Sequence, residues 1–470
     1  MRIKHEEIEI VAGSPFDNCK LDRKKYASVL TSLIENYEEG FVLAINNKWG
    51  TGKTTFLKMW NQDLKDKEFQ TIYFNAWEND FENSPLTAVM GELKSLKTEK
   101  TKEQFASAVE KAAKISKHLA PTIVKALAEK YINIETLNQG LADITEGLVD
   151  VFENDVKQYS ERKKGIQEFK KSLSTFVANT SNGKSLVFMI DELDRCRPDY
   201  SVSLLEQIKH FFTVPNIVFV LSIDKKQLGN AIRGVYGSEN LDYEEYLRRF
   251  IDIEYSLPEP ESNSFYNYLY GFFEFDEFFE SADRKQYRQL ASDKNNFLSI
   301  CSVLFANNQI TLRQQEKIFS HSRIALRAFA NNSFVIPSLY LFLVFLKNIE
   351  QDLYNRINQK EISIELLQDE FLRIVSGSIS EDTEREILWL EAYLVNSYNI
   401  YLNYPYFRNK LYKYESGNNV LVIKSVVDKS EDGANFLHAL ESISRYDQIG
   451  EVSIGHLLKK INLMESFKFS

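Results

Sequence analysis

The chain has 470 residues and a formal net charge of −10. A chain of this length holds two or three hydrophobic cores, which leaves room for one nucleotide domain with helical additions. The acidic balance argues against a nucleic-acid-binding surface spread over the whole chain, and no nucleic-acid partner is indicated.

The cysteines, the N-terminal residues and the apolar runs predict a cytoplasmic protein. The three cysteines form no CxxC pair, which fits a reducing compartment and argues against a structural zinc site. The N-terminus has no apolar core of a secretory leader. The longest apolar run, residues 334–346, contains Pro337 and is shorter than the ~20 residues of a membrane span. We therefore expect a buried core helix there and no transmembrane segment.

The first predicted element is a helix within residues 21–40, which ends at Gly40. Helical spacing predicts a buried face made of Tyr26, Val29, Leu30, Leu33 and Ile34. Three charged residues stand at its start: Asp22, Arg23 and Lys24. They are interpreted either as solvated, capping groups or as contacts to a nucleotide base.

Residues 41–57 read as a strand, a phosphate loop and a helix. The β-branched, apolar run Val42–Ile45 leads into a loop that matches GxxxxGK[ST], except that Asn47 replaces the first glycine. Gly50 and Gly52 allow backbone angles that turn successive N–H groups around an anion. The helix that follows adds the positive end of its dipole. The alternative is a glycine-rich turn that binds nothing.

Each polar group of this loop has a predicted task. Lys53 would place its charge on the β- and γ-phosphates, and the Thr54 hydroxyl would bind Mg²⁺. Asn47 tolerates left-handed geometry, so we expect an intact loop. The predicted nucleotide-binding residues are Asn47, Trp49, Gly50, Thr51, Gly52, Lys53, Thr54 and Thr55.

A second strand, Thr71–Phe74, is predicted to end at the same edge of the sheet as the phosphate loop. Asn75 and Glu78 are therefore candidates to orient a water or a residue of a neighbouring subunit. Residues 81–184 are helical in pattern, with heptad spacing over 134–151. We expect an arm or bundle that folds back on itself; coiled-coil association between subunits is the alternative.

The second chemical centre follows the apolar run Leu186–Ile190, which is typical of a parallel strand buried on both faces. Asp191 would hold Mg²⁺, directly or through water, and Glu192 would polarise the attacking water as a general base. Adjacent carboxylates at the end of a buried strand need such partners because desolvated charge is costly. Arg195 is interpreted as an ion-pair partner of Asp194 or Asp191, or as a phosphate contact.

Three further residues are candidates for catalysis: Asp224, Arg249 and Arg313. Asp224 follows the predicted strand Ile217–Ile223 and is either a sensor of the γ-phosphate or a helix N-cap. Arg249 precedes a fifth strand, predicted over 251–255, and would reach a neighbouring subunit's nucleotide. Alternatively, Arg248 and Arg249 pair with glutamates of their own helix.

The chain beyond residue 260 is helical and rich in aromatic residues. Arg313 begins one of these helices and is the candidate to close over bound nucleotide as part of a lid. A short strand is expected within residues 418–427.

Several segments together resemble the KAP family of P-loop NTPases: NKWGTGKTT, IYFNAW, FMIDELDRCRPDY, VFVLSIDKKQL, YLRRFIDIEYSLP and TLRQQEKIF. The likeness spans about residues 15 to 330. That family includes bacterial phage-exclusion proteins and an animal neuronal membrane scaffold. The resemblance implies a glutamate-type ATPase, with phosphate at Lys53, Mg²⁺ at Thr54 and Asp191, and catalysis at Glu192. Many relatives insert transmembrane helices between the two nucleotide motifs, whereas the insertion here is polar.

We therefore expect an α/β P-loop NTPase with an additional-strand (ASCE-type), parallel five-stranded sheet, a large helical insertion and a helical C-terminal region. The expected divisions are a core (1–80 and 181–260), the insertion (81–180), a lid-like helical domain (261–360) and a mainly helical region (361–470). The core would bind ATP and Mg²⁺.

The expected function is ATP hydrolysis coupled to a conformational change or to assembly. The resemblance suggests bacterial anti-phage defence or a signalling assembly as its setting. We expect a homo-oligomer or a protein partner bound through the helical regions. Two alternatives stay open: a nucleotide-gated scaffold with little turnover, and a kinase, which the adjacent carboxylates disfavour because they suit water as the acceptor.

Overall fold

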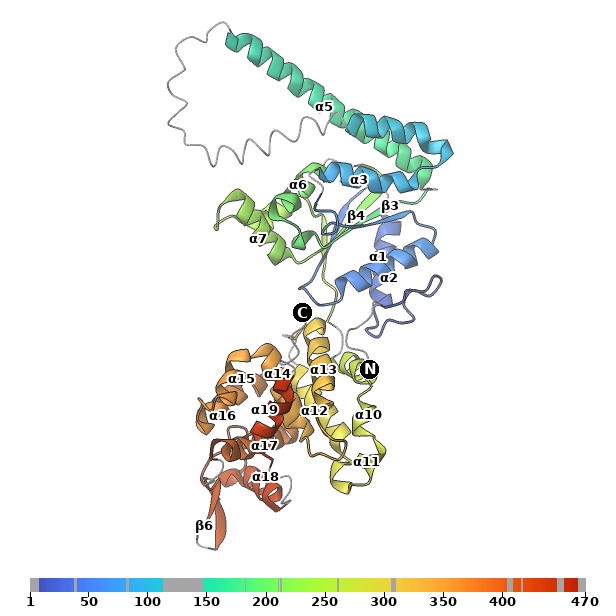
Figure 1. Cartoon of the computed structure of the whole chain (residues 1–470). Helices are drawn as coiled ribbons and strands as arrows, with labels where there is room; N and C mark the ends of the chain where they lie inside the picture. The colour runs from blue at the N-terminus through green and yellow to red at the C-terminus, as the bar shows by residue number, and fades with distance from the viewer. Residues whose placement is uncertain are drawn as a thin grey trace. The chain divides into compact units, whose positions relative to one another are not determined.

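The protein is described here from a computed structural model. It describes residues 8–37, 40–81, 84–112, 147–181, 183–209, 211, 214–259, 262–305, 310–403, 409–415, 417–445 and 452–463. The chain divides after Pro258 into two compact units, which we call the first unit (from Ile8) and the second unit (from Glu259). Figure 1 shows the elements of each.

The first unit is built on five parallel strands: β1 (Val42–Asn46), β2 (Thr71–Asn75), β3 (Leu186–Asp191), β4 (Ile217–Ile223) and β5 (Ile253–Tyr255). Their order is β2-β3-β4-β1-β5. Because β4 lies between β1 and β3, the predicted additional-strand, parallel five-stranded sheet is confirmed. The fifth strand begins at Ile253, two residues later than predicted. Asp252 donates its N–H to the Val42 carbonyl, but the Val42 N–H is bonded at 2.8 Å by the Asp252 carboxylate instead of by a strand carbonyl.

Helices cover both faces of this sheet. On one face, α1 (Lys24–Asn36) and α2 (Lys53–Asp66) pack against buried side chains of β1, β3 and β4. On the other lie α3 (Pro85–Leu93), α6 (Pro198–Ile208) and α7 (Lys225–Tyr236), with the short α8 (Tyr243–Leu247). The predicted helix at α1 is confirmed, but it ends at Asn36 rather than at Gly40, because the backbone is already extended at Tyr37. Val29 is 59% exposed and does not belong to its buried face.

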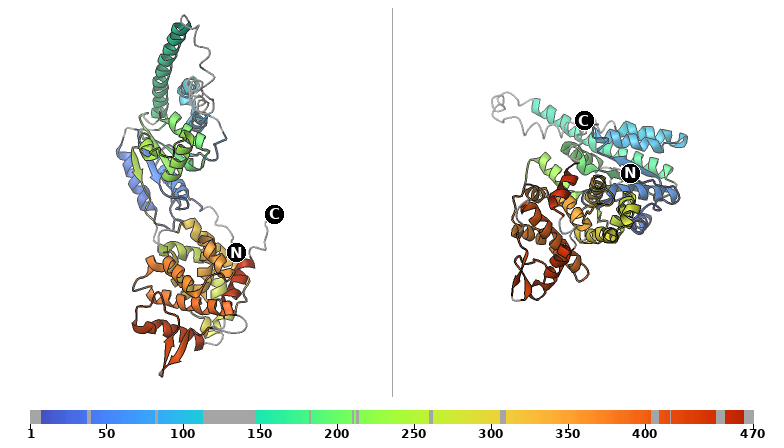
Figure 2. Two further views of the ribbon diagram at one scale, coloured as in Figure 1. Left: turned by 90° about the vertical axis from the view of Figure 1, so that its left-hand side faces the viewer. Right: turned by 60° about the horizontal axis from the view of Figure 1, so that its bottom comes forward.

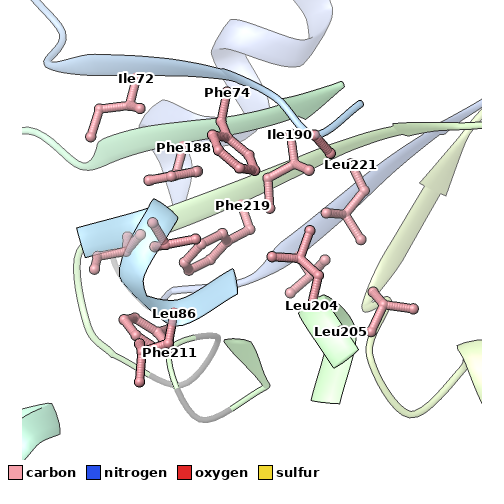
Figure 3. Packing of buried hydrophobic residues seen from close by; sticks show 14 of the residues in the cluster. Ile72, Phe74, Leu86, Phe188, Ile190, Leu204, Leu205, Phe211, Phe219 and Leu221 are labelled. Carbon is pink, nitrogen blue, oxygen red and sulfur yellow. The ribbon is translucent and has the colours of Figure 1, made fainter. Parts of the chain in front are cut away.

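The core on the second face is aromatic. Figure 3 shows Phe74, Phe188 and Phe219 from three neighbouring strands. The ring centroids of Phe74 and Phe188 lie 6.3 Å apart, and those of Phe188 and Phe219 lie 5.5 Å apart. Each is at most 1% exposed, and burying a side chain of this size contributes about 1.5–3 kcal/mol. This packing holds the strands that carry the acidic motif in fixed register.

The long helix α5 (Gly147–Thr180) leads back into β3. Figure 2 shows it as one continuous helix. Near its end Phe169, Leu173 and Phe176 are buried in the same core as α3 and the sheet. Residues 113–146, which hold most of the predicted heptad stripe, lie outside the described residues.

The second unit is mainly helical. Its helices are α9 (Ser262–Phe272), α10 (Asp276–Phe279), α11 (Ala282–Lys285), α12 (Asp293–Phe305), α13 (Leu312–Leu326), α14 (Pro337–Ile349), α15 (Gln351–Asn358), α16 (Ile364–Val375), α17 (Glu384–Asn403), α18 (Ala434–Arg445) and α19 (Ile454–Asn462). A hairpin joins β6 (Tyr412–Glu415) to β7 (Asn418–Leu421). The strand at β7 confirms the one predicted there; β6 was not predicted.

The apolar run of residues 334–346 falls largely in α14, where Leu339 to Leu346 are all buried. The predicted core helix is therefore confirmed. In the ranges that the structure describes, no helix has the length and hydropathy that crossing a membrane requires.

Candidate functional site

The phosphate-loop motif joins β1 to the first turn of α2. Gly50 and Gly52 adopt positive φ angles of 79° and 84°, a geometry that residues with a β-carbon rarely reach. The Thr51 hydroxyl donates a hydrogen bond of 2.9 Å to the carbonyl of Lys48 and closes the turn. Thr54 and Thr55 are half-buried in the first turn of α2. The N-terminus of this 14-residue helix supplies N–H groups and a positive dipole end to the loop.

Lys53 is buried at the centre of the motif, with 9% of its surface exposed. Its ammonium donates to the main-chain oxygen of Asn47 and, at 3.1 Å, to that of Lys48. Burial lowers the pKa of Lys53, and the carboxylates of Asp194, Asp224 and Asp191 oppose this effect. The predicted phosphate-binding lysine therefore lies in the electrostatic field of the predicted Mg²⁺ ligand, Asp191.

Asn47 does not use the left-handed geometry expected of it, since its φ angle is not positive. Its side chain bonds the backbone of one distant residue instead. The Asn47 amide nitrogen donates to the Leu257 carbonyl at 2.9 Å, and the amide oxygen accepts from the Leu257 N–H at 2.8 Å. Asn47 therefore stands in the position of the usual glycine but adds a side chain that forms hydrogen bonds of its own.

A hydrogen bond ties the phosphate loop to the acidic motif. The indole N–H of Trp49, a residue 41% exposed, donates to the carboxylate of Asp194. Asp194 lies in the single turn η4 (Leu193–Arg195) that follows β3. Burial raises the pKa of Asp194, while the bond from Trp49 and the charge of Lys53 lower it. Nothing in the sequence connects Trp49 with Asp194, apart from the presence of each residue in a motif.

Asp191 is almost fully buried, at 1% exposed. Its carboxylate accepts from the Tyr73 hydroxyl at 2.8 Å and from the Glu192 N–H at 2.9 Å. No lysine or arginine of the described residues forms an ion pair with it. Burial and the Asp191 charge raise the pKa of Tyr73, which keeps its hydroxyl a neutral donor. Tyr73 was missed, although the alternation of β2 and its register with β3 place it on the face of Asp191.

Ser222 lies opposite Asp191 in the register of β3 and β4. Its hydroxyl oxygen is buried and has no hydrogen-bond partner in the described structure. A buried carboxylate without a basic partner, beside an unpaired hydroxyl, provides the oxygen ligands that Mg²⁺ prefers. These residues fit a magnesium site.

Glu192 occupies a left-handed backbone position, with φ 60° and ψ 25°. Such a conformation costs a residue other than glycine roughly 1 kcal/mol or more. Its carboxylate pairs with the Arg195 guanidinium at 2.7 Å, and the two side chains are only 12% and 24% exposed. The expected pairing of Arg195 with Asp194 or Asp191 is therefore incorrect, because the turn η4 brings it back to Glu192 instead.

The turn after β2 lies against this ion pair. The Arg195 guanidinium lies 5.9 Å from the centroid of the Trp77 ring, which is 52% exposed. The Asn75 amide oxygen accepts from the N–H groups of Trp77 and Glu78 at 3.1 and 3.4 Å and so fixes the turn. Asn75 acts on its own turn, and its predicted role toward a water or a neighbour stays a prediction.

The remaining candidates are Asp224, Arg249 and Arg313. Asp224 caps α7, accepting from the N–H groups of Lys226 and Gln227 at 3.2 and 3.3 Å. Its role as a phosphate sensor stays a prediction. Arg248 pairs with Glu245 at 3.1 Å. Arg249 is exposed in the first unit and Arg313 is exposed on α13 of the second unit, and their catalytic roles also stay predictions.

The profile of the KAP family P-loop domain matches residues 23–332, which is more than half of the chain. The chain belongs to the KAP family. The match contains the phosphate loop, the acidic strand and the turn η4 after that strand, so nucleotide binding is implied for this KAP protein. No curated protein sequence matches the chain significantly.

Several solved structures resemble this KAP protein only loosely. A DNA replication initiation factor is 12% identical, with 95% of this chain and 93% of that chain covered and a TM-score of 0.29. The Aeropyrum pernix ORC2 protein is 11% identical, with 91% and 95% covered and a TM-score of 0.34. C. elegans PCH-2 is 14% identical, with 72% and 70% covered and a TM-score of 0.26. Scores this low support no conclusion about function.

Proposed function

We propose that this KAP protein binds ATP with Mg²⁺ and hydrolyses it, and that nucleotide state drives a conformational change or assembly. The observation that supports this most is the position of buried Lys53, at the first turn of α2 and in the field of Asp191. A phosphate group at the loop would meet main-chain N–H groups, the helix dipole and the lysine charge together.

The residues have separate tasks in this proposal. Thr54 and Asp191, with Ser222 nearby, would hold Mg²⁺, which when bound neutralises charge on the phosphate oxygens. Glu192 would accept the proton of the attacking water as a general base. Arg195 would act as a positioning residue, because its ion pair fixes where the Glu192 carboxylate lies. Arg249 and Arg313 are proposed to neutralise charge on the nucleotide, from a neighbouring subunit or from a lid.

Nucleotide binding and phosphate release by three variants test the proposal. Lys53→Ala is expected to lose most of its ATP affinity, whereas Glu192→Gln is expected to bind ATP and to lose roughly 100-fold or more in turnover, the usual contribution of a general base. Lys65→Ala, an exposed lysine in the last turn of α2, serves as the control.

Each outcome has a distinct meaning. Wild-type protein that binds ATP but releases no more phosphate than Glu192→Gln is a nucleotide-gated scaffold rather than an enzyme. Wild-type protein that binds no nucleotide overturns the proposal entirely. As a biological setting we propose bacterial anti-phage defence, which rests on the family resemblance alone. Equal phage yields from hosts carrying wild-type protein and Lys53→Ala would exclude it.

A further inference from the structure

Asn47 makes a contact that the usual phosphate-loop residue cannot make. The motif carries glycine at this position, and glycine has no side chain. The Asn47 side-chain amide instead forms two hydrogen bonds with the backbone of Leu257: it donates to the carbonyl at 2.9 Å and accepts from the N–H at 2.8 Å. Leu257 is 2% exposed, so these bonds are shielded from water and their loss leaves backbone groups unpaired.

The segment that Asn47 holds leads to the second unit. Leu257 follows β5, and the second unit begins two residues later at Glu259. A second anchor acts on the same segment: Arg23, which is 4% exposed, donates from its guanidinium to the Pro258 carbonyl at 2.6 Å. The solvated, capping role expected of the Arg23 side chain is therefore incorrect, because the side chain is buried and its guanidinium bonds this carbonyl. A contact of Arg23 with a nucleotide base stays a prediction.

The neighbouring Asn46 strengthens this connection. Its amide nitrogen donates to the Glu254 carboxylate at 2.7 Å, and its amide oxygen accepts from the Lys225 N–H at 3.0 Å. Glu254 in turn pairs with the Lys225 ammonium at 2.8 Å. Asn46, the last residue of β1, and Asn47, the next residue, therefore connect β5 and the segment after it to the start of the phosphate loop through side-chain hydrogen bonds.

Asn47 also contacts Lys53, the lysine that is proposed to bind phosphate. The Lys53 ammonium donates to the main-chain oxygen of Asn47. A phosphate group that accepts hydrogen bonds from Lys53 competes with this carbonyl for the same donors. The position of the Asn47 peptide, and with it the position of its side chain, is therefore sensitive to what Lys53 binds.

We propose that Asn47 communicates occupancy of the phosphate loop to residues 257 and 258, and hence to the start of the second unit. The proposal rests on nucleotide binding as proposed above, but not on hydrolysis. It deepens the proposed coupling by naming the residue that carries it. Because coupling between two sites is reciprocal, releasing the segment from Asn47 also changes the affinity of the loop for nucleotide.

Hydrogen exchange of the full chain tests this, in peptides that contain the Leu257 amide. Wild-type protein, Asn47→Gly and Asn47→Ala are compared with and without Mg²⁺ and the β,γ-imido analogue of ATP at saturation, so that differences in affinity do not enter. Asn36→Gly, an exposed asparagine at the end of α1, is the control. Two variants without the amide are used so that a failure of one to fold still leaves a measurement.

In wild-type protein and the control, the analogue is expected to change exchange at Leu257. In the two Asn47 variants, exchange without nucleotide is expected to be about tenfold faster, as loss of a buried hydrogen bond implies, and the response to the analogue is lost. A full response in either folded variant overturns the proposal. So does failure of both variants to saturate, since Asn47 then belongs to the binding site itself. Absence of binding by wild-type protein overturns both this proposal and the proposed function.

Discussion

Among single residues, Arg195 makes the surroundings of the two adjacent carboxylates different, because it forms an ion pair with Glu192 and not with Asp191. Asp191 is held by neutral donors, the Tyr73 hydroxyl and a backbone N–H. Glu192 is held by a cation, at 2.7 Å, from a left-handed backbone position. The two adjacent acids thus have different surroundings, which supports different tasks for them: Asp191 toward a metal ion and Glu192 toward water.

Arg195→Gln is expected to lower the turnover number by ~10–100-fold with little change in KM for ATP, because it removes a charge-assisted hydrogen bond to a general base but no contact to nucleotide. Arg195→Lys should restore part of the rate, since it keeps the charge. Steady-state phosphate release measures both. Arg248→Gln, whose exposed ion pair with Glu245 contributes little, is the control. An unchanged or increased turnover number in Arg195→Gln would exclude a positioning role.

At the scale of elements, the end of α5 is part of the first unit's core rather than part of a separate arm. The rings of Phe176 and Phe105 have centroids 5.3 Å apart, and those of Phe169 and Phe211 meet edge to face at 4.7 Å. Because α5 leads into β3, this packing also supports the strand that ends at Asp191. The end of the inserted segment and the strand that carries Asp191 are therefore stabilised by one hydrophobic cluster.

Phe176→Ala is expected to reduce the free energy of unfolding of the first unit by about 3–5 kcal/mol, through lost burial and the cavity left behind. Phe176 is fully buried, whereas Phe81 is 77% exposed and its replacement by alanine should change that free energy by about 0.5 kcal/mol or less. Denaturant titration followed by circular dichroism measures the difference. Equal effects of the two substitutions would show that α5 does not share the core.

For the whole molecule, the family match and the structural division do not coincide. The KAP profile extends from residue 23 to residue 332, whereas the first unit ends at Pro258. The family domain therefore includes α9 to α13 of the second unit together with the nucleotide unit. The family domain thus continues past the segment that Asn47 contacts, which is the segment that the proposed coupling would act on.

Ligand binding should stabilise the first unit selectively. With the ATP analogue and Mg²⁺ at about 100 times the dissociation constant, linkage adds about 2.7 kcal/mol to the free energy of unfolding of the unit that binds. Trp49, Trp60 and Trp77 lie in the first unit and Trp389 in the second, so fluorescence of Trp389→Phe follows the first unit alone. Its melting temperature should rise with the analogue, and Lys53→Ala in this background should abolish the rise. A rise that survives in that double variant would place nucleotide binding elsewhere.

The parallel sheet, the phosphate-loop motif, the acidic residues at the end of a strand and the core helix α14 could all be predicted from the amino-acid sequence. These depend on local features that a short window contains: apolar runs, glycines where φ must be positive, and a Lys-Thr pair at a helix start. The exposure of Val29 shows what a short stretch of sequence does not predict. Its spacing indicates one face of a helix, but not how much of that face the rest of the protein covers.

The hydrogen-bond and ion-pair partners of the side chains could not be predicted from the sequence and became visible only in the three-dimensional structure. Asn47 and Leu257 are 210 residues apart, and Trp49 and Asp194 are 145 apart, so no spacing in the sequence connects them. Arg195 pairs with Glu192 because a single helical turn and a left-handed residue direct both side chains to one point. Hydrogen bonds and ion pairs depend on directions and distances in three dimensions, which are fixed only when the sheet has brought its strand ends together.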